Sequence, residues 1–237
     1  MCRLADLLSG TIIISFGSFY FLTLEFGHNC DLQVINQLII KLANQLIGTM
    51  HNIEPYYNWR HIYVSEEDSR SPFYNRQYSE FEFTATVYNY YIHPQWDDFG
   101  SRTLYLKVLQ ADYEEKYVVI ELIGEWNDAI ENDIMELKRE VMDKFMEEGI
   151  YKFVLIAENV LNFHSGDKDY YQEWYEEVTD ENGWIVSLNM PQATQHDFKK
   201  AKLNYYVELM ELENWRIYKP YHLFKKIDDE LNHRLAI

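Results

Sequence analysis

Cysteine, glycine and proline are scarce in this chain. Only two cysteines occur in 237 residues, and both, Cys2 and Cys30, lie within the first thirty. The rest of the chain therefore contains no disulfide, no thiolate nucleophile and no cysteine metal site, which fits a reducing cytoplasm. With 9 Gly and 5 Pro beside 47% hydrophobic and 25% charged residues, the composition is that of a packed globular protein.

An excess of basic charge is also absent. The chain carries 39 acidic and 21 basic residues, a net charge of −18 that is spread along its length. Proteins that bind nucleic acid present clustered Lys and Arg, so DNA and RNA are not expected as partners. The acidic charge is explained by solubility or, alternatively, by attraction to a basic patch on another protein.

The common catalytic signatures are missing. The sequence has no Gly-rich phosphate loop, no Gly-x-Ser-x-Gly elbow and no His-Glu-x-x-His motif, and no cofactor is expected. Histidine and aspartate can bind metals or move protons, and one such set lies in expected turns: His93, Asp97, Asp98, His164 and Asp167. Their spacing matches no known ligand motif, and such residues in turns are commonly solvated or capping groups.

One uncharged hydrophobic run stands apart, at residues 7–24. Its length just reaches the minimum for crossing a bilayer, but it lacks a basic flank and a small-residue cleavage site. The composition changes at Met50, from aliphatic before it to polar and aromatic after it. Residues 1–49 are therefore a dispensable or spurious extension, a membrane or export segment, or an integral part of the fold.

Three regions follow from the patterning. Residues 1–49 include an expected amphipathic helix over 32–48, which Gly48 would end. Residues 50–102 form an aromatic-rich elaboration, in which the alternation over 80–87 predicts one half-buried strand. Residues 103–237 have the regular alternation of strands and helices that is typical of an α/β domain.

Within this α/β body, apolar runs predict strands over 104–109, 117–123, 153–157 and 184–189, and a short one over 215–218. Helices are expected over 128–148, 169–178, 195–212 and 220–235. Asp128 and Glu131 have the spacing of a capping box, and Ile130 would belong to the apolar stripe of the first helix. The result is a sheet of about four to five strands flanked by helices.

Four features carry a resemblance to a known family. They are an apolar strand that ends in Leu122-Ile123-Gly124, a buried strand over 153–157, the Ser165-Gly166 step before a helix, and a final strand-then-helix ending. In this order they resemble the STAS domain, the fold of anti-sigma factor antagonists, across roughly residues 103–235. The resemblance implies a STAS-like sheet, a role in protein–protein contact, and a regulatory phosphorylated side chain at the position of Ser165.

Ser165 has two interpretations. A phosphate at a helix start would meet free backbone N–H groups and the positive end of the helix dipole. An ordinary N-cap serine would instead contribute about 1 kcal/mol with no regulatory role. Asp167, Asp169, Glu173 and Glu176 surround the position, so an added phosphate would act by repelling a partner. The usual acidic residue before the serine is His164 here.

The aromatic block between residues 56 and 96 either packs on the body or forms an interface. It comprises Tyr56, Tyr57, Trp59, Tyr63, Phe73, Tyr74, Tyr78, Phe81, Phe83, Tyr88, Tyr90, Tyr91 and Trp96. Together these patterns predict a cytoplasmic, non-catalytic protein–protein interaction or regulatory module with a protein partner. The alternative is a metal- or carboxylate-assisted hydrolase that uses the His/Asp set. A membrane is expected as a partner only if residues 7–24 are an anchor.

Overall fold

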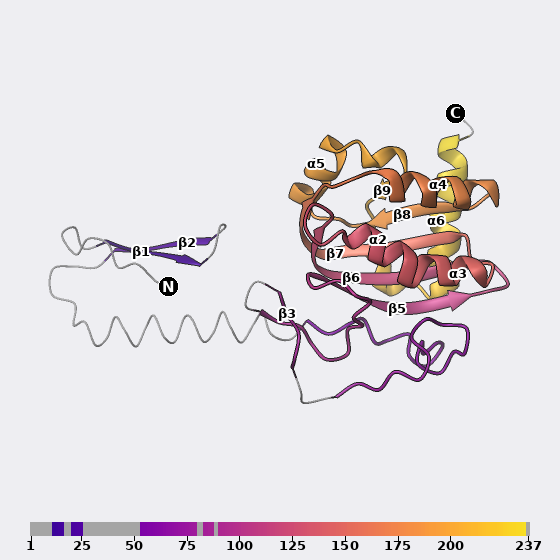
Figure 1. The fold of residues 1–237 in the computed structure, drawn as a ribbon, viewed down its shortest axis with the longest axis horizontal. Coiled ribbons are helices and arrows are strands. Elements are labelled where there is room, and N and C mark those ends of the chain that lie inside the picture. The colour runs from indigo at the N-terminus through magenta and orange to yellow at the C-terminus, as the bar shows by residue number, and fades with distance from the viewer. Residues whose placement is uncertain (1–10, 17–19, 26–52, 80–82, 88–89, 236–237) are drawn as a thin grey trace. The chain divides into compact units, whose positions relative to one another are not determined.

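The computed structural model describes residues 11–16, 20–25, 53–79, 83–87 and 90–235. The chain divides into two compact units, Met1–Met50 and His51–Ile237 (Figure 1). In the first unit, β1 (Thr11–Phe16) pairs with β2 (Tyr20–Glu25) in antiparallel fashion. The helix predicted over 32–48 lies outside the described residues. Among the residues that are described, no helix is long and apolar enough to cross a membrane.

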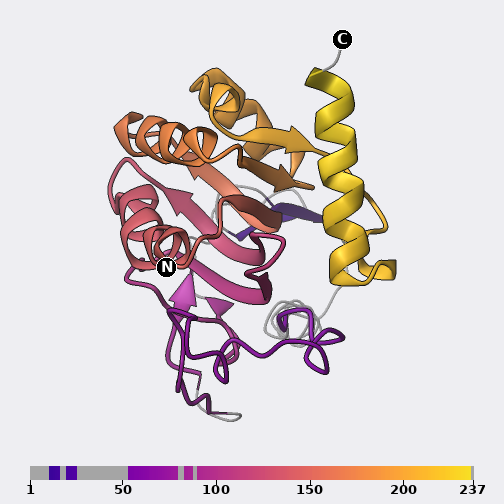
Figure 2. The same cartoon turned by 90° about the vertical axis from the view of Figure 1, so that its right-hand side faces the viewer.

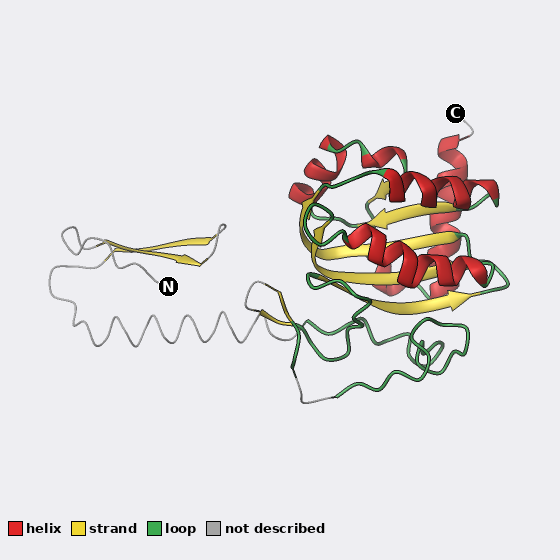
Figure 3. Cartoon of the chain, viewed as in Figure 1, coloured by secondary structure: helices red, strands yellow, loops and turns green. Residues whose placement is uncertain are grey.

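The second unit is built on a five-stranded sheet in the order β5-β6-β7-β8-β9 (Figure 3). The strands are β5 (Leu104–Asp112), β6 (Tyr117–Asn127), β7 (Lys152–His164), β8 (Trp184–Leu188) and β9 (Glu208–Met210). The first pair is antiparallel and the other three pairs are parallel. The predicted α/β sheet of four to five strands flanked by helices is thus confirmed, and β6 and β7 extend further than predicted.

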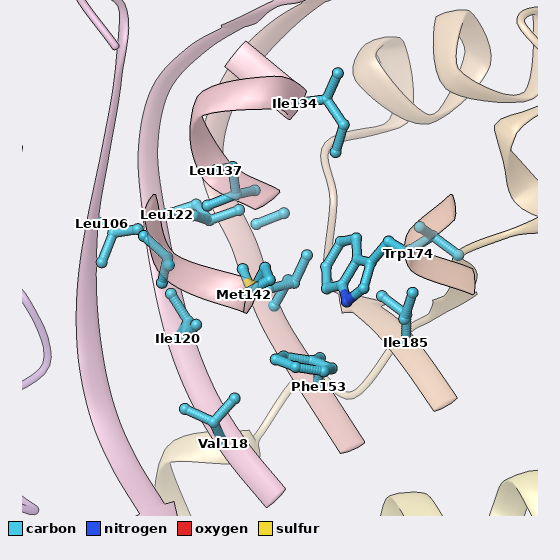
Figure 4. Packing of buried hydrophobic residues seen from close by; sticks show 14 of the residues in the cluster. Leu106, Val118, Ile120, Leu122, Ile134, Leu137, Met142, Phe153, Trp174 and Ile185 are labelled. Atoms are coloured by element: carbon cyan, nitrogen blue, oxygen red, sulfur yellow. The ribbon is translucent and has the colours of Figure 1, made fainter. Parts of the chain in front are cut away.

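Successive side chains of β6 point to opposite faces of the sheet, and both faces are covered. Val118, Ile120 and Leu122 belong to the core under helices α2 (Asp133–Leu137), α3 (Asp143–Glu147), α4 (Asp169–Asp180) and α5 (Gln192–Lys200) (Figure 4). Tyr117 and Val119 face the other way and pack with α6 (Pro220–Leu235), which lies on the opposite side of the sheet from α2 to α5 (Figure 2). Both faces are buried because the helices that follow β6, β7 and β8 cover one of them, and α6 together with Trp59 covers the other in part.

The helix predicted over 128–148 begins later than expected. Helix α2 starts at Asp133, and the π-helical turn Lys138–Met142 joins it to α3. The predicted capping box is wrong, because Asn132 is the residue at the N-cap position and its φ is 54°. Ile130 is not part of the buried stripe, since it lies in the preceding turn and is 78% exposed.

Two predictions near the C-terminus are also wrong. A single helix is expected over 195–212, but the structure has several elements there. Helix α5 ends at Lys200, the chain turns at Lys202 with φ 60°, and the 3-10 helix Leu203–Tyr205 and the edge strand β9 follow. The expected strand 215–218 is the 3-10 helix Trp215–Ile217. Leu203, Val207 and Met210 are buried at spacings of four and three residues, which imitates the helical period. The predicted strand over 184–189 and the helices at 169–178 and 220–235 are confirmed.

Residues 53–102 are mostly irregular and cover parts of the sheet that α6 does not. Their strands are short, β3 (Thr86–Val87) and β4 (Tyr90–Tyr91), and residues 80–82 of the predicted strand lie outside the described part of the chain. Trp59 joins the α6-side core, and Trp96 packs with Tyr105 of β5 and Ile123 of β6. Much of the aromatic block is therefore packing, as one of the two interpretations expects, while Tyr57, Tyr74 and Tyr91 remain exposed.

Candidate functional site

The connection after β6, residues 128–132, contacts the connection after β7, residues 165–168. The backbone N–H of Asp128 donates to the carbonyl of His164 across 2.9 Å. A Cβ placed on Gly166 would lie only 2.4 Å from the carbonyl oxygen of Asp128, closer than real side-chain atoms approach. Glycine is therefore required at position 166 for the two backbones to meet.

The Asp128 carboxylate is the centre of a buried hydrogen-bond network. Its Oδ1 accepts from the indole Nε1 of Trp126 at 3.0 Å and from the backbone N–H of Ile134 at 2.9 Å. Its Oδ2 accepts from the hydroxyl of Tyr171 at 2.7 Å. Burial raises the pKa of Asp128 to about 7, although these donors oppose the shift. This one side chain links β6, α2 and α4.

A second buried carboxylate, Asp133, ties the same region to the start of β5. Asp133 accepts from the hydroxyl of Ser101 at 2.6 Å, the hydroxyl of Thr103 at 3.0 Å and the N–H of Asn127 at 2.7 Å. Burial raises its pKa, and the three donors lower it in part. The backbone around residues 128–133 is thus fixed from several directions.

Four exposed side chains belong to the two connections and to the last residues of β7. Ile130 and Ser165 are exposed, one on each connection. Nε2 of His164 lies 2.6 Å from Oε1 of Glu125, a buried residue of β6. Leu161, near the end of β7, is half-exposed. We call the exposed residues Ile130, Leu161, His164 and Ser165 the β6–β7 loop surface.

The predicted helix start at Ser165 is wrong. Helix α4 begins at Asp169 with Lys168 as its N-cap residue, so Ser165 lies in the connection before it. The side chain that meets the first amides is Asp167, whose Oδ1 accepts the N–H of Lys168 at 2.6 Å and of Asp169 at 3.3 Å. Ser165 is therefore not an ordinary N-cap, and its regulatory role stays a prediction.

The residues of the alternative His/Asp site have separate partners. Nε2 of His93 lies 3.6 Å from Glu54, and Oδ1 of Asp98 accepts the N–H of Gly100 at 2.8 Å. Asp97 is buried, accepts from the Tyr78 hydroxyl and lies 3.3 Å from Lys107 Nζ. His164 and Asp167 belong to the β7–α4 side described above. Among the described residues, no three His, Cys, Asp or Glu side chains are placed to hold one metal ion.

Sequence reasoning missed the role of three residues: Asp128, Asp133 and Tyr171. The capping-box spacing predicts a local role for Asp128, but its partners include a side chain 43 residues away. A carboxylate flanked by Trp126 and the apolar helix start at Ile134 was a usable signal, because an acid between apolar residues needs buried donors. The identity of those donors depends on the tertiary fold.

The chain was compared with known proteins. No family model and no curated protein sequence matches it. A crystal structure of a proposed anti-sigma factor antagonist of Thermotoga maritima, TM1081, matches 47% of this chain and 90% of its own, with 16% identity and a TM-score of 0.36. An NMR structure of the protein TM1081 matches 44% of this chain and 78% of its own, with 16% identity and a TM-score of 0.35.

Proposed function

We propose that the α/β body, residues 103–235, is a non-catalytic regulatory module that binds a partner protein through the β6–β7 loop surface. The main support is the exposure of Ile130 and Ser165. They lie on two connections whose backbones are fixed by the buried hydrogen-bond network of Asp128. An aliphatic side chain held on a fixed backbone loses little conformational freedom on binding.

Ser165 is proposed as the regulatory position of this surface. It is small and exposed, and it lies next to Gly166, where the backbones of the two connections meet. A phosphate here would add negative charge beside Asp167 and Asp169, and would oppose the approach of a partner surface. Unmodified Ser165 allows that approach.

The test compares partner binding by matched variants. The partner is captured from the native cell with the wild-type chain and identified by mass spectrometry, and its affinity is then measured by calorimetry. Ser165→Asp and Ile130→Asp should weaken binding by about 1–3 kcal/mol because of desolvation and charge repulsion. Ser165→Ala should leave the affinity nearly unchanged.

Ile217→Asp is the control, because Ile217 is 75% exposed, almost as exposed as Ile130, but lies in the 3-10 helix before α6. It should bind the partner as the wild type does. If the wild type, Ser165→Asp and Ile130→Asp bind the partner with equal affinity, the β6–β7 loop surface is not the binding site. Weakening by Ile217→Asp alone would place the interface elsewhere.

A further inference from the structure

A surface groove of about 390 Å³ lies between helices α2–α3, the turn at residues 98–100 and residues 72–76. This volume is within the range of about 300–1,000 Å³ of small-ligand sites. Two buried aromatic side chains, Phe73 and Phe99, contribute to its walls together with Pro72. The other side chains that line it are charged: Arg76, Asp98, Glu136, Glu140 and Lys144.

The two basic side chains of the groove already have partners. The guanidinium of Arg76 lies 4.9 Å from the ring centre of Phe73 and 3.7 Å from Oδ1 of the buried Asp97. Nζ of Lys144 binds Oε2 of Glu140 at 2.7 Å. Asp98 and Glu136 differ, because neither forms an ion pair with any residue in the described part of the chain.

Both of these side chains lie close to Gly100. Oδ1 of Asp98 accepts the backbone N–H of Gly100 at 2.8 Å. Gly100 has φ +114°, and a Cβ there would lie 2.9 Å from Oε2 of Glu136. The absence of a side chain at position 100 therefore lets Glu136 lie against the turn, so that two carboxylates without a cationic partner line the groove.

We infer that this groove binds a basic side chain, of the arginine or lysine type, from a partner polypeptide. The groove has room for the methylene stem of such a side chain beside Pro72. Asp98 and Glu136 match its positive charge, as charge-assisted hydrogen bonds require. A chain with a net charge of −18 also favours the approach of a basic partner. The inference is independent of the proposed function, because it uses neither Ser165 nor Ile130.

The test uses the full chain and two short probes. The first is acetyl-Gly-Arg-Gly-amide, and the second replaces arginine by citrulline, which has nearly the same shape and no charge. We expect the arginine probe to shift the amide resonance of Gly100 in a saturable way, with Kd on the order of 5 mM. The citrulline probe should give no saturable shift.

Glu136→Gln should weaken binding of the arginine probe about fivefold, as expected for loss of one partly exposed ion pair. It leaves the hydrogen bond between Asp98 and Gly100 in place, so its effect does not come from the turn. Glu147→Gln is the matched control, because Glu147 is exposed at the end of the same helical segment but does not line the groove. It should bind as the wild type does.

Three results would overturn the inference: no saturable shift at Gly100, equal binding of the citrulline probe, or equal weakening by Glu136→Gln and Glu147→Gln. The last would mean that the probe responds to the overall acidic charge. None of these results bears on partner binding at the β6–β7 loop surface, which the Ile130 and Ser165 variants test separately.

Discussion

The hydroxyl of Tyr171 donates to the carboxylate of Asp128 across 2.7 Å, and both side chains are buried. This contact joins helix α4 to the connection after β6. The other carboxylate oxygen accepts from the indole N–H of Trp126 and from the backbone N–H of Ile134 in the first turn of α2. The start of α4, and with it the connection that carries Ser165, is therefore held by the connection after β6.

Removal of this contact should destabilise the fold. Tyr171→Phe keeps the ring and deletes the donor, which leaves the buried Asp128 with fewer partners. We expect the free energy of unfolding to fall by about 1–3 kcal/mol, the usual cost of an unsatisfied buried polar group. Urea unfolding measures it, with Tyr175→Phe as the control on a more exposed position of the same helix. Equal losses for both variants would contradict a special role for Tyr171.

Two buried carboxyls predict how stability depends on pH. Burial raises the pKa of Asp128 to about 7 and that of Glu121 on β6 to about 7. Near Glu121, the backbone of Tyr56 and the side chain of Arg216 oppose the shift, and Glu158 adds to it. In the unfolded chain both carboxyls ionise near pH 4. Between about pH 4 and pH 7 the folded chain holds protons that the unfolded chain has lost.

The free energy of unfolding should therefore fall as the pH rises through this window and level off above it. Urea unfolding at several values of pH between 4.5 and 8 measures the slope. Asp128→Asn and Glu121→Gln should each flatten it, since each removes one titrating group. Asp229→Asn, on the exposed side of α6, should keep the wild-type slope. If neither Asp128→Asn nor Glu121→Gln changes the slope, the pH dependence of the free energy of unfolding comes from other groups.

The parts of the fold that could be predicted are those that local pattern determines. Helix α4 buries Tyr171, Trp174 and Val178 on one side, and β8 reads as a buried strand from its apolar residues alone. The start of α2 could not be predicted, because the residues with capping-box spacing have distant partners. Asp128 binds Tyr171, and Glu131 accepts two hydrogen bonds from Arg102 at 2.9 and 3.0 Å.

In the candidate site, too, local pattern predicts some features and tertiary contacts determine the others. The sequence predicts the position of Ser165 after a buried strand, and the structure places it on the connection between β7 and α4. The sequence does not show that Asp167 takes the first amides of α4, because both residues are of capping type. The exposure of Ile130 depends on the late start of α2, and so on the same tertiary contacts of Asp128.

Residues 1–49 are predicted to be unnecessary for folding of the rest. The chain divides into compact units at Met50. Among the residues whose burial the structure describes, the three core clusters extend from Trp59 to Leu231. A chain that begins at Met50 should keep its melting temperature to within the few degrees that a change of about 1 kcal/mol produces. Calorimetry measures this. Aggregation of the shortened chain, or recovery of the full chain only in membranes, would contradict the prediction.

Lys138 should be the most sensitive charged residue of the fold. Its side chain is fully buried on the π-helical turn, and Nζ lies 2.7 Å from Asp143, 2.8 Å from Glu177 and 3.3 Å from Glu173. These contacts hold the helical segment 133–147 against α4. Lys138→Ala leaves three carboxylates without their shared cation and opens a cavity, so we expect a loss of about 3–5 kcal/mol in the free energy of unfolding.

Lys138→Met separates the charge from the volume, because methionine fills much of the same space. Lys138→Met should lower the free energy of unfolding by less than Lys138→Ala does, since the three carboxylates are partly exposed and can be hydrated. Lys144→Met is the control: its ion pair with Glu140 is exposed and should contribute at most about 1 kcal/mol. If Lys138→Met and Lys144→Met unfold at the same urea concentration, the buried ammonium does not hold α4 against the helical segment 133–147.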